Sequence, residues 1–184
     1  MDFKNYIPNQ AFPQIKKWIT ELNIDIRFVN PRKTKLGDYQ FRNNQHFITV
    51  NNNLNKYAAL ITLTHEIAHA FTFVEFGKTI KPHAIQWKEN FKKLMLTFFD
   101  DNIFALRKGD EVGERLAKIS ADQNILLMVC DQCAVRRNMA TGTFEQCGTG
   151  EVKAKGFVDG VVAGCFPQLY TALGGNPPDQ VISL

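Results

Sequence analysis

Apolar residues follow two different periods along the first half of the chain. Within residues 11–22 they recur every three or four positions, which indicates an amphipathic helix. Within residues 24–29 apolar and charged side chains alternate, which is typical of a β-strand. Residues 36–42 and 46–50 predict two more strands, and the polar segment 43–45 between them predicts a hairpin turn.

Longer helical patterns follow the predicted hairpin. Residues 54–76 predict a long helix that ends at Gly77, a residue suited to a helix C-cap. Residues 83–99 predict a second helix, which a proline precedes. After it the periodicity weakens, and a short helix near residues 112–119 and an apolar strand at residues 125–129 are indicated. Together these elements predict an α+β fold.

Composition limits the class of protein. Hydrophobic residues make up 45% of the 184 positions, which is enough for a folded core and argues against global disorder. The first residues lack the charged and apolar segments of a signal peptide, and no apolar run reaches the roughly 20 residues that span a bilayer. We therefore expect a soluble, cytoplasmic protein with no membrane association.

Charge is distributed unevenly along the chain. Residues 1–100 contain 14 Lys and Arg against 8 Asp and Glu, whereas residues 101–184 contain 8 against 10. A basic half favours a polyanion such as DNA, but a solvated surface accounts for the same residues. Arg32, Lys33 and Lys35, in the loop before the predicted hairpin, are the candidate nucleic-acid contacts.

The sequence His65-Glu66-Ile67-Ala68-His69 lies inside the long predicted helix. Residues four apart on a helix project from one face, so both imidazoles can bind a single zinc ion. Glu66 follows the first histidine, where its carboxylate can accept a proton from a water that zinc acidifies. His83 begins the next predicted helix and is the candidate third ligand. The set predicts a hydrolytic zinc site with Glu66 as the general base.

A plainer interpretation of the same histidines is also open. The five-residue pattern occurs by chance on the surface of many helices, and His83 alone is explained equally as an exposed residue at a helix start. The chain has four histidines, however, and three of them fall within nineteen residues. The fourth, His46, lies beside the Asn-rich turn and is expected to face solvent.

The string around this motif resembles the SprT-like metalloproteases, the family of the DNA–protein crosslink protease Spartan. The shared pattern is HExxH, then Gly77, then Pro82-His83, with Trp87-Lys88 four and five residues after that histidine. The likeness includes the predicted hairpin and covers about residues 10–100.

This resemblance implies a zincin-type metalloprotease domain. Its expected parts are an N-terminal helix, a short antiparallel sheet, the HExxH helix and a second helix that carries the third ligand. The resemblance implies one catalytic zinc bound by His65, His69 and His83, with Glu66 as the catalytic residue.

The resemblance also implies a zinc ribbon after the protease domain. Cys130 and Cys133 form one C-x-x-C knuckle, and Cys147 stands in the place of the second, whose last position is Gly150. Three thiolates leave a structural zinc one ligand short unless Cys165 completes the set. Otherwise this segment is a degenerate ribbon with buried or free thiols. A second, structural zinc therefore depends on these cysteines.

The expected organisation has three parts. Residues 1–120 form the SprT-like domain, residues 121–155 form the zinc-ribbon-like segment, and residues 156–184 form a tail of unknown structure.

The sequence thus predicts a zinc metalloprotease that cleaves protein, with DNA-bound or DNA-crosslinked protein as the substrate class that the resemblance implies. Two alternatives remain: a DNA-associated zinc-binding module with vestigial proteolysis, and a zinc hydrolase of a non-peptide substrate. Glu66 argues against the first alternative, because a purely structural zinc needs no base.

Overall fold

The computed structural model describes residues 3–172, and the chain divides into two compact units, Met1–Met95 and Leu96–Leu184. The division lies ahead of the domain boundary predicted at residue 120. The reason is that the helices between residues 100 and 123 pack against a strand of the second unit. No helix in the described part of the chain has both the length and the apolarity to cross a membrane.

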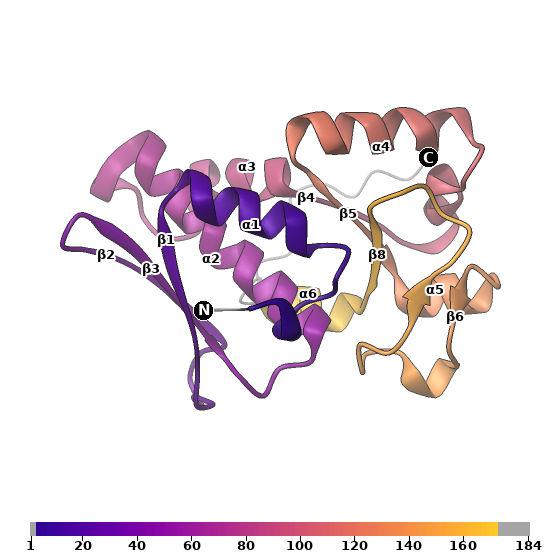
Figure 1. The fold of residues 1–184 in the computed structure, drawn as a ribbon, viewed down its shortest axis with the longest axis horizontal. Helices are drawn as coiled ribbons and strands as arrows, with labels where there is room; N and C mark the ends of the chain where they lie inside the picture. The colour runs from indigo at the N-terminus through magenta and orange to yellow at the C-terminus, as the bar shows by residue number, and fades with distance from the viewer. Residues whose placement is uncertain (1–2, 173–184) are drawn as a thin grey trace. The chain divides into compact units, whose positions relative to one another are not determined.

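In the N-terminal unit, the strands of one sheet lie in the chain between two sets of helices (Figure 1). Its elements are η1 (Lys4–Tyr6), α1 (Phe12–Glu21), β1 (Ile24–Val29), β2 (Gly37–Arg42), β3 (Gln45–Asn51), α2 (Lys56–Phe76), η2 (Gly77–Thr79) and α3 (Ile85–Leu94). The helix predicted at residues 11–22 and the strands predicted before and after the loop are therefore present.

The three strands form a mixed sheet in the order β1-β3-β2. β2 and β3 are an antiparallel hairpin, and its turn residues Asn43 and Asn44 have φ of 50° and 57°, as a two-residue hairpin turn requires. β1 pairs with the other edge of β3 in parallel, so the expectation of an antiparallel sheet is wrong for this strand. Alternation specifies strands but not their neighbours, and here the pairing Ile26↔Ile48 places the apolar side chains of both strands on one face.

Helix α2 is the buried centre of this unit. Asn55 caps it, because its side chain accepts hydrogen bonds from the backbone N–H groups of Tyr57 and Ala58. The helix packs on β2 and β3 and also contacts α1 and α3, so apolar residues surround it rather than forming one stripe. Leu60 and Ile67 are both 0% exposed. A helix held on several sides is a rigid support for a site.

The second predicted helix is shorter than expected. The sequence predicted residues 83–99, but α3 covers Ile85–Leu94 and the chain then continues as strand β4 (Met95–Phe98). His83 stands outside the helix because its φ is +60°, a left-handed conformation. At the other end, Met95 turns extended with φ −146°, and β4 joins a sheet of the second unit.

A second sheet organises the C-terminal unit. Its elements are η3 (Asp100–Leu106), α4 (Glu111–Gln123), β5 (Leu126–Cys130), α5 (Asp131–Arg136), β6 (Ala140–Thr141), η4 (Phe144–Gln146), β7 (Lys153–Ala154), β8 (Val161–Gly164) and α6 (Phe166–Ala172). The sheet has the order β4-β5-β8, with β5 and β8 parallel, and Leu127, Val129 and Val161 contribute to its core. The tail whose structure the sequence left unknown contains β8 and α6, while residues 173–184 lie outside the described residues.

Candidate metal centre

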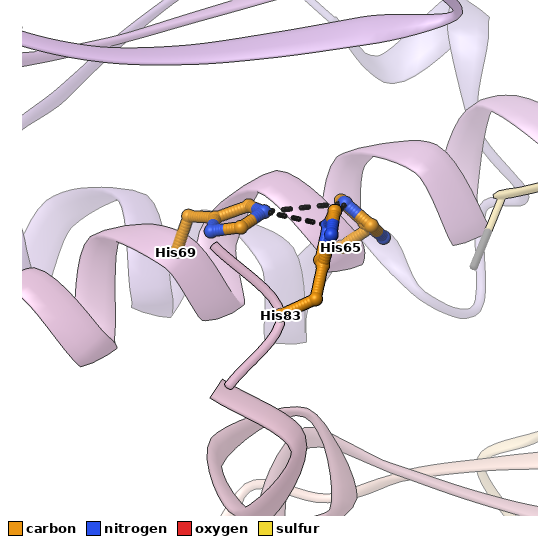
Figure 2. A group of neighbouring side chains, drawn as sticks. All are labelled: His65, His69 and His83. Carbon is orange, nitrogen blue, oxygen red and sulfur yellow. Dashed lines mark hydrogen bonds between the residues drawn. The ribbon is translucent and has the colours of Figure 1, made fainter. Parts of the chain in front are cut away.

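Three histidine rings converge in the N-terminal unit. His65 and His69 lie one turn apart on α2, and His83 enters from the loop between η2 and α3. Their Nε2 atoms are 3.3 Å apart between His65 and His69, 3.2 Å between His69 and His83, and 3.0 Å between His83 and His65. Figure 2 shows the three rings turned toward one another. The structure therefore brings together all three histidines that the sequence named as ligands.

This arrangement fits a metal ion of the size and geometry of zinc. A tetrahedral zinc with Zn–N bonds of about 2.0–2.1 Å holds two ligand nitrogens about 3.3 Å apart. Burial lowers the pKa of His65 to about 3, and the nearby rings of His69 and His83 lower it as well. Burial, followed by repulsion from His83, lowers the pKa of His69 to about 3. The rings are therefore uncharged at neutral pH, which is the form that binds a metal.

Backbone strain accompanies the third histidine, His83. A non-glycine residue in the left-handed conformation of His83 costs about 1 kcal/mol or more. Such a conformation persists where surrounding contacts fix it, and it is often found at functional sites. Here it turns the His83 ring toward α2, while Ala84 becomes the N-cap of α3.

Trp87 packs against all three imidazoles. Its ring centroid lies 4.7 Å from that of His65, 5.2 Å from that of His69 and 4.7 Å from that of His83. Its Nε1–H donates to the backbone carbonyl of His65 at 3.4 Å. Metal-binding histidines are usually oriented by a hydrogen bond to the second ring nitrogen, but the buried Nδ1 of His65 has no partner among the described residues. Trp87 contacts all three rings instead, and the sequence analysis had named this residue only as part of the family pattern.

Glu66 lies beside the start of β2. It is 7% exposed, and a Cβ atom at Gly37 would lie only 2.5 Å from its Oε1. Burial, followed by the nearby carboxylate of Asp38, raises the pKa of Glu66 to about 8. The positive charges of Arg32 and Lys35 act in the opposite direction. The group can therefore gain and lose a proton near neutral pH, as a general base must.

The candidate nucleic-acid contacts are thus close to this carboxyl group. Arg32 donates from Nε to the side-chain oxygen of Asn51 at 3.0 Å, and Lys35 forms an ion pair with Asp38 at 2.7 Å. Lys33 is exposed. Two of the three cations therefore have partners within the protein, and nucleic-acid contact by this loop stays a prediction.

His46 is buried, so the expectation that it faces solvent is wrong. It is 8% exposed, its Nδ1 is hydrogen bonded to the Tyr39 hydroxyl at 2.9 Å, and its ring lies 4.8 Å from that of Phe41. The reason is strand phase: β3 already begins at Gln45, and the alternation of the strand places His46 on the same buried face as Ile48.

An open cleft of about 300 Å³ lies next to His69. Its apolar and aromatic wall is made by Tyr39, Phe41, Phe73, Ile80, Pro82 and Trp87. The Tyr39 ring is nearly parallel to that of His69, with 6.2 Å between centroids, and burial raises the pKa of Tyr39 above its usual value. The phenol is therefore protonated at neutral pH, and the cleft offers an aromatic surface directly beside the histidines.

All four cysteines belong to the C-terminal unit. Cys130 ends β5, Cys133 lies in α5, Cys147 follows η4 and Cys165 follows β8. In the part of the chain that the structure describes, three ligand atoms within 4.8 Å of one another are found at the histidines but at no set of these cysteines. The C-x-x-C sequence lies between a strand and a helix, and zinc at the cysteines stays a prediction.

Comparison with protein families identifies this architecture. The model of the SprT-like family matches residues 8–105, just over half of the chain, and the span includes the three histidines, Glu66 and Trp87. The match ends before the first cysteine, so it gives no evidence for a zinc ribbon. Comparisons with curated proteins and with solved structures found no match.

Proposed function

Because the chain belongs to the SprT-like family, we propose that it is a zinc-dependent endopeptidase. The three histidines hold the metal, and Glu66 is the general base. The observation that carries this proposal is the approach of three uncharged Nε2 atoms to within 3.3 Å of one another, with a buried carboxyl group at the next position in the chain after His65.

Each part of the site has a distinct chemical role. A zinc ion, when bound, supplies Lewis acidity that acidifies water and polarises the carbonyl group under attack. Glu66 accepts the proton of the attacking water and returns it to the leaving amine. Burial raises the pKa of Glu66, and the positive charge of a bound zinc would act in the opposite direction, toward the carboxylate form that accepts a proton.

The cleft beside His69 defines where a peptide substrate lies. Its wall of aromatic rings suits an apolar side chain, whose burial there is worth about 1.5–3 kcal/mol. A side chain in the cleft places the neighbouring peptide bond next to the histidines. We therefore expect cleavage beside a large apolar residue rather than beside a basic one, because Lys78 and Lys81 also line the cleft.

Protein bound or crosslinked to DNA is the proposed physiological substrate class. Two observations support it: the family resemblance, and the excess of Lys and Arg within residues 1–100. Phosphate contacts of this kind are electrostatic and carry no base sequence. DNA should therefore raise the cleavage rate of a DNA-binding protein substrate, and added salt should remove that effect.

Glu66→Gln tests the proposed function. The amide is of equal size but cannot accept the proton, so cleavage of an unfolded protein such as casein should fall by at least about 10²-fold. Zinc content, measured by elemental analysis, and the melting temperature should stay near the wild-type values. Thr62→Ser, a change one turn earlier on α2, is the matched control and should keep its activity.

Three results would redirect the assignment. Cleavage at the wild-type rate by Glu66→Gln would mean that Glu66 is not the base. Zinc binding with no cleavage of any protein substrate, with or without duplex DNA, would favour a zinc-binding module. Hydrolysis of esters or other non-peptide compounds in place of peptides would favour the non-peptide hydrolase.

A further inference from the structure

The fold of the C-terminal unit gathers the cysteines at one edge of its parallel sheet. Cys130 is the last residue of β5, and it pairs in register with Gly164, which ends β8 and precedes Cys165. Since β5 and β8 run in the same direction, both strands deliver their cysteines at their carboxyl ends. Figure 1 shows β5 continuing into α5 and β8 lying beside it.

Cys130 and Cys133 are in direct contact. The backbone N–H of Cys133 donates to the Sγ of Cys130 at 3.4 Å. The Sγ of Cys133 also accepts a hydrogen bond from the backbone N–H of Asp100, with 3.1 Å between nitrogen and sulfur. Cys133 is partly exposed, whereas Cys130 is 8% exposed. The pair thus consists of one accessible sulfur and one buried sulfur behind it.

The other two cysteines are arranged differently. The thiol of Cys147 is directed to the backbone carbonyl of Thr143 at 3.8 Å. The Sγ of Cys165 lies near the backbone of Gly148, 3.6 Å from the position a Cβ would take there. A tetrahedral zinc needs its sulfur ligands around one point. Among the described residues no three cysteine sulfurs meet within 4.8 Å of one another, whereas Cys130 and Cys133 are in direct contact.

The buried carboxylate of Asp131 fixes the surroundings of the pair. It is 4% exposed and accepts hydrogen bonds from the backbone N–H groups of Gln132 at 2.7 Å and Gly148 at 2.7 Å. These bonds tie the loop after η4 to the first residue of α5. The C-x-x-C segment is therefore held in place by contacts that do not use its sulfurs.

From these contacts we infer that Cys130 and Cys133 are a thiol–disulfide exchange pair, a second activity in the C-terminal unit that is independent of the proposed peptidase. A C-x-x-C pair that follows a strand of a parallel sheet is a typical position for such chemistry. The substrate class is a disulfide, to which the pair gives two electrons as its own two thiols are oxidised to a disulfide.

The exchange runs in two balanced steps. The accessible thiolate of Cys133 attacks one sulfur of the substrate disulfide, which forms a mixed disulfide and releases one substrate thiol. Cys130 then loses its proton to solvent and attacks the Sγ of Cys133, which releases the second substrate thiol. The protein passes from two thiols to one disulfide, and the substrate disulfide is reduced to two thiols. The N–H of Asp100 stabilises the negative charge on Cys133 before the attack.

The experiment uses the full chain and oxidised glutathione as the disulfide. The reduced protein is equilibrated in buffers that range from reduced to oxidised glutathione, quenched in acid and alkylated, and its peptides are identified by mass spectrometry. In the wild type, the Cys130 and Cys133 thiols should disappear together and a peptide linked between them should form. Cys147→Ser and Cys165→Ser are the matched controls and should form the same linked peptide.

Variants separate the two roles. Cys130→Ser should trap glutathione on Cys133 as a stable mixed disulfide, whereas Cys133→Ser should leave Cys130 reduced because the buried sulfur is not reached. Circular dichroism checks that each variant is folded, and the wild-type measurement stands even where a variant is not.

Three outcomes would overturn the inference. One is a wild type in which both thiols stay reduced in oxidised glutathione. Another is a disulfide formed between other cysteines in place of this pair. The third is a zinc ion that protects the thiols and is lost in each of the four Cys→Ser variants, which would assign the cysteines to a structural metal site.

Discussion

Gly37→Ala probes the position of Glu66 without changing any proposed ligand or the base itself. The new Cβ would lie 2.5 Å from Glu66 Oε1, 2.9 Å from Glu66 Cγ and 2.7 Å from Thr62 Cγ2. Ordinary contacts begin at 3.4 Å, so the carboxylate must withdraw by about 1 Å. No histidine is among the atoms that the methyl group meets most closely, so zinc binding should be unaffected.

The cost should appear in catalysis more than in folding. A carboxylate is the free end of a flexible side chain, so the crowding is relieved mainly by turning Glu66 away, and the loss of stability should lie near the low end of the about 1–3 kcal/mol typical of overpacking. A displacement of about 1 Å in a catalytic group lowers a rate by about 10²-fold. That factor corresponds to about 2.7 kcal/mol of transition-state stabilisation.

The assay compares kcat/KM on casein, zinc content and melting temperature for the wild type and Gly37→Ala. The double variant Gly37→Ala/Thr62→Ser removes the methyl group at 2.7 Å, so it should recover stability but not activity. Wild-type kcat/KM in a folded, zinc-loaded Gly37→Ala protein would refute the placement of Glu66 as the base.

Three further predictions concern the histidines. His83→Ala should lower zinc content strongly, because two imidazoles hold zinc poorly; full occupancy in elemental analysis would exclude His83 as a ligand. Trp87→Ala should weaken zinc binding by about 10–100-fold in competition with a chelator, since it removes the ring that packs against all three imidazoles. In the chelated protein, burial lowers the pKa of His65 and His69 to about 3 from the usual 6.5, so the unfolded chain binds more protons below pH 6.5. The raised pKa of Glu66 acts in the opposite sense over this range, so the chelated Glu66→Gln variant isolates the histidines. The melting temperature of that variant should fall between pH 7 and pH 5, and an unchanged value would contradict the burial of these rings.

Local sequence determined the part of the site that lies within one helix. His65, Glu66 and His69 share a helix whose apolar residues, Asn55 cap and C-terminal glycine are all short-range signals. Once such a helix forms, its 3.6-residue period fixes which side chains project together. The hairpin before it was equally local, because the turn residues Asn43 and Asn44 accept the left-handed conformation it needs.

Contacts between residues distant in the sequence determined the other features of the fold and of the site. The parallel pairing of β1 with β3, the burial of His46 and the closeness of Gly37 to Glu66 depend on which elements pack together, and a hydrophobic pattern carries no such information. The hydrogen bond from the backbone N–H of Asp100 to Cys133 is likewise a tertiary contact, because the two residues are 33 positions apart in the chain.

His83 shows both levels at one residue. Its residue type and its spacing from His65 and His69 predicted that it is a ligand. The sequence also predicted that it begins a helix, and its backbone would then be helical. Only the tertiary structure shows that His83 lies in a loop, has a left-handed backbone conformation and packs against Trp87. The physical reason is that backbone strain of about 1 kcal/mol or more is disfavoured locally and persists only where contacts made elsewhere in the fold offset it.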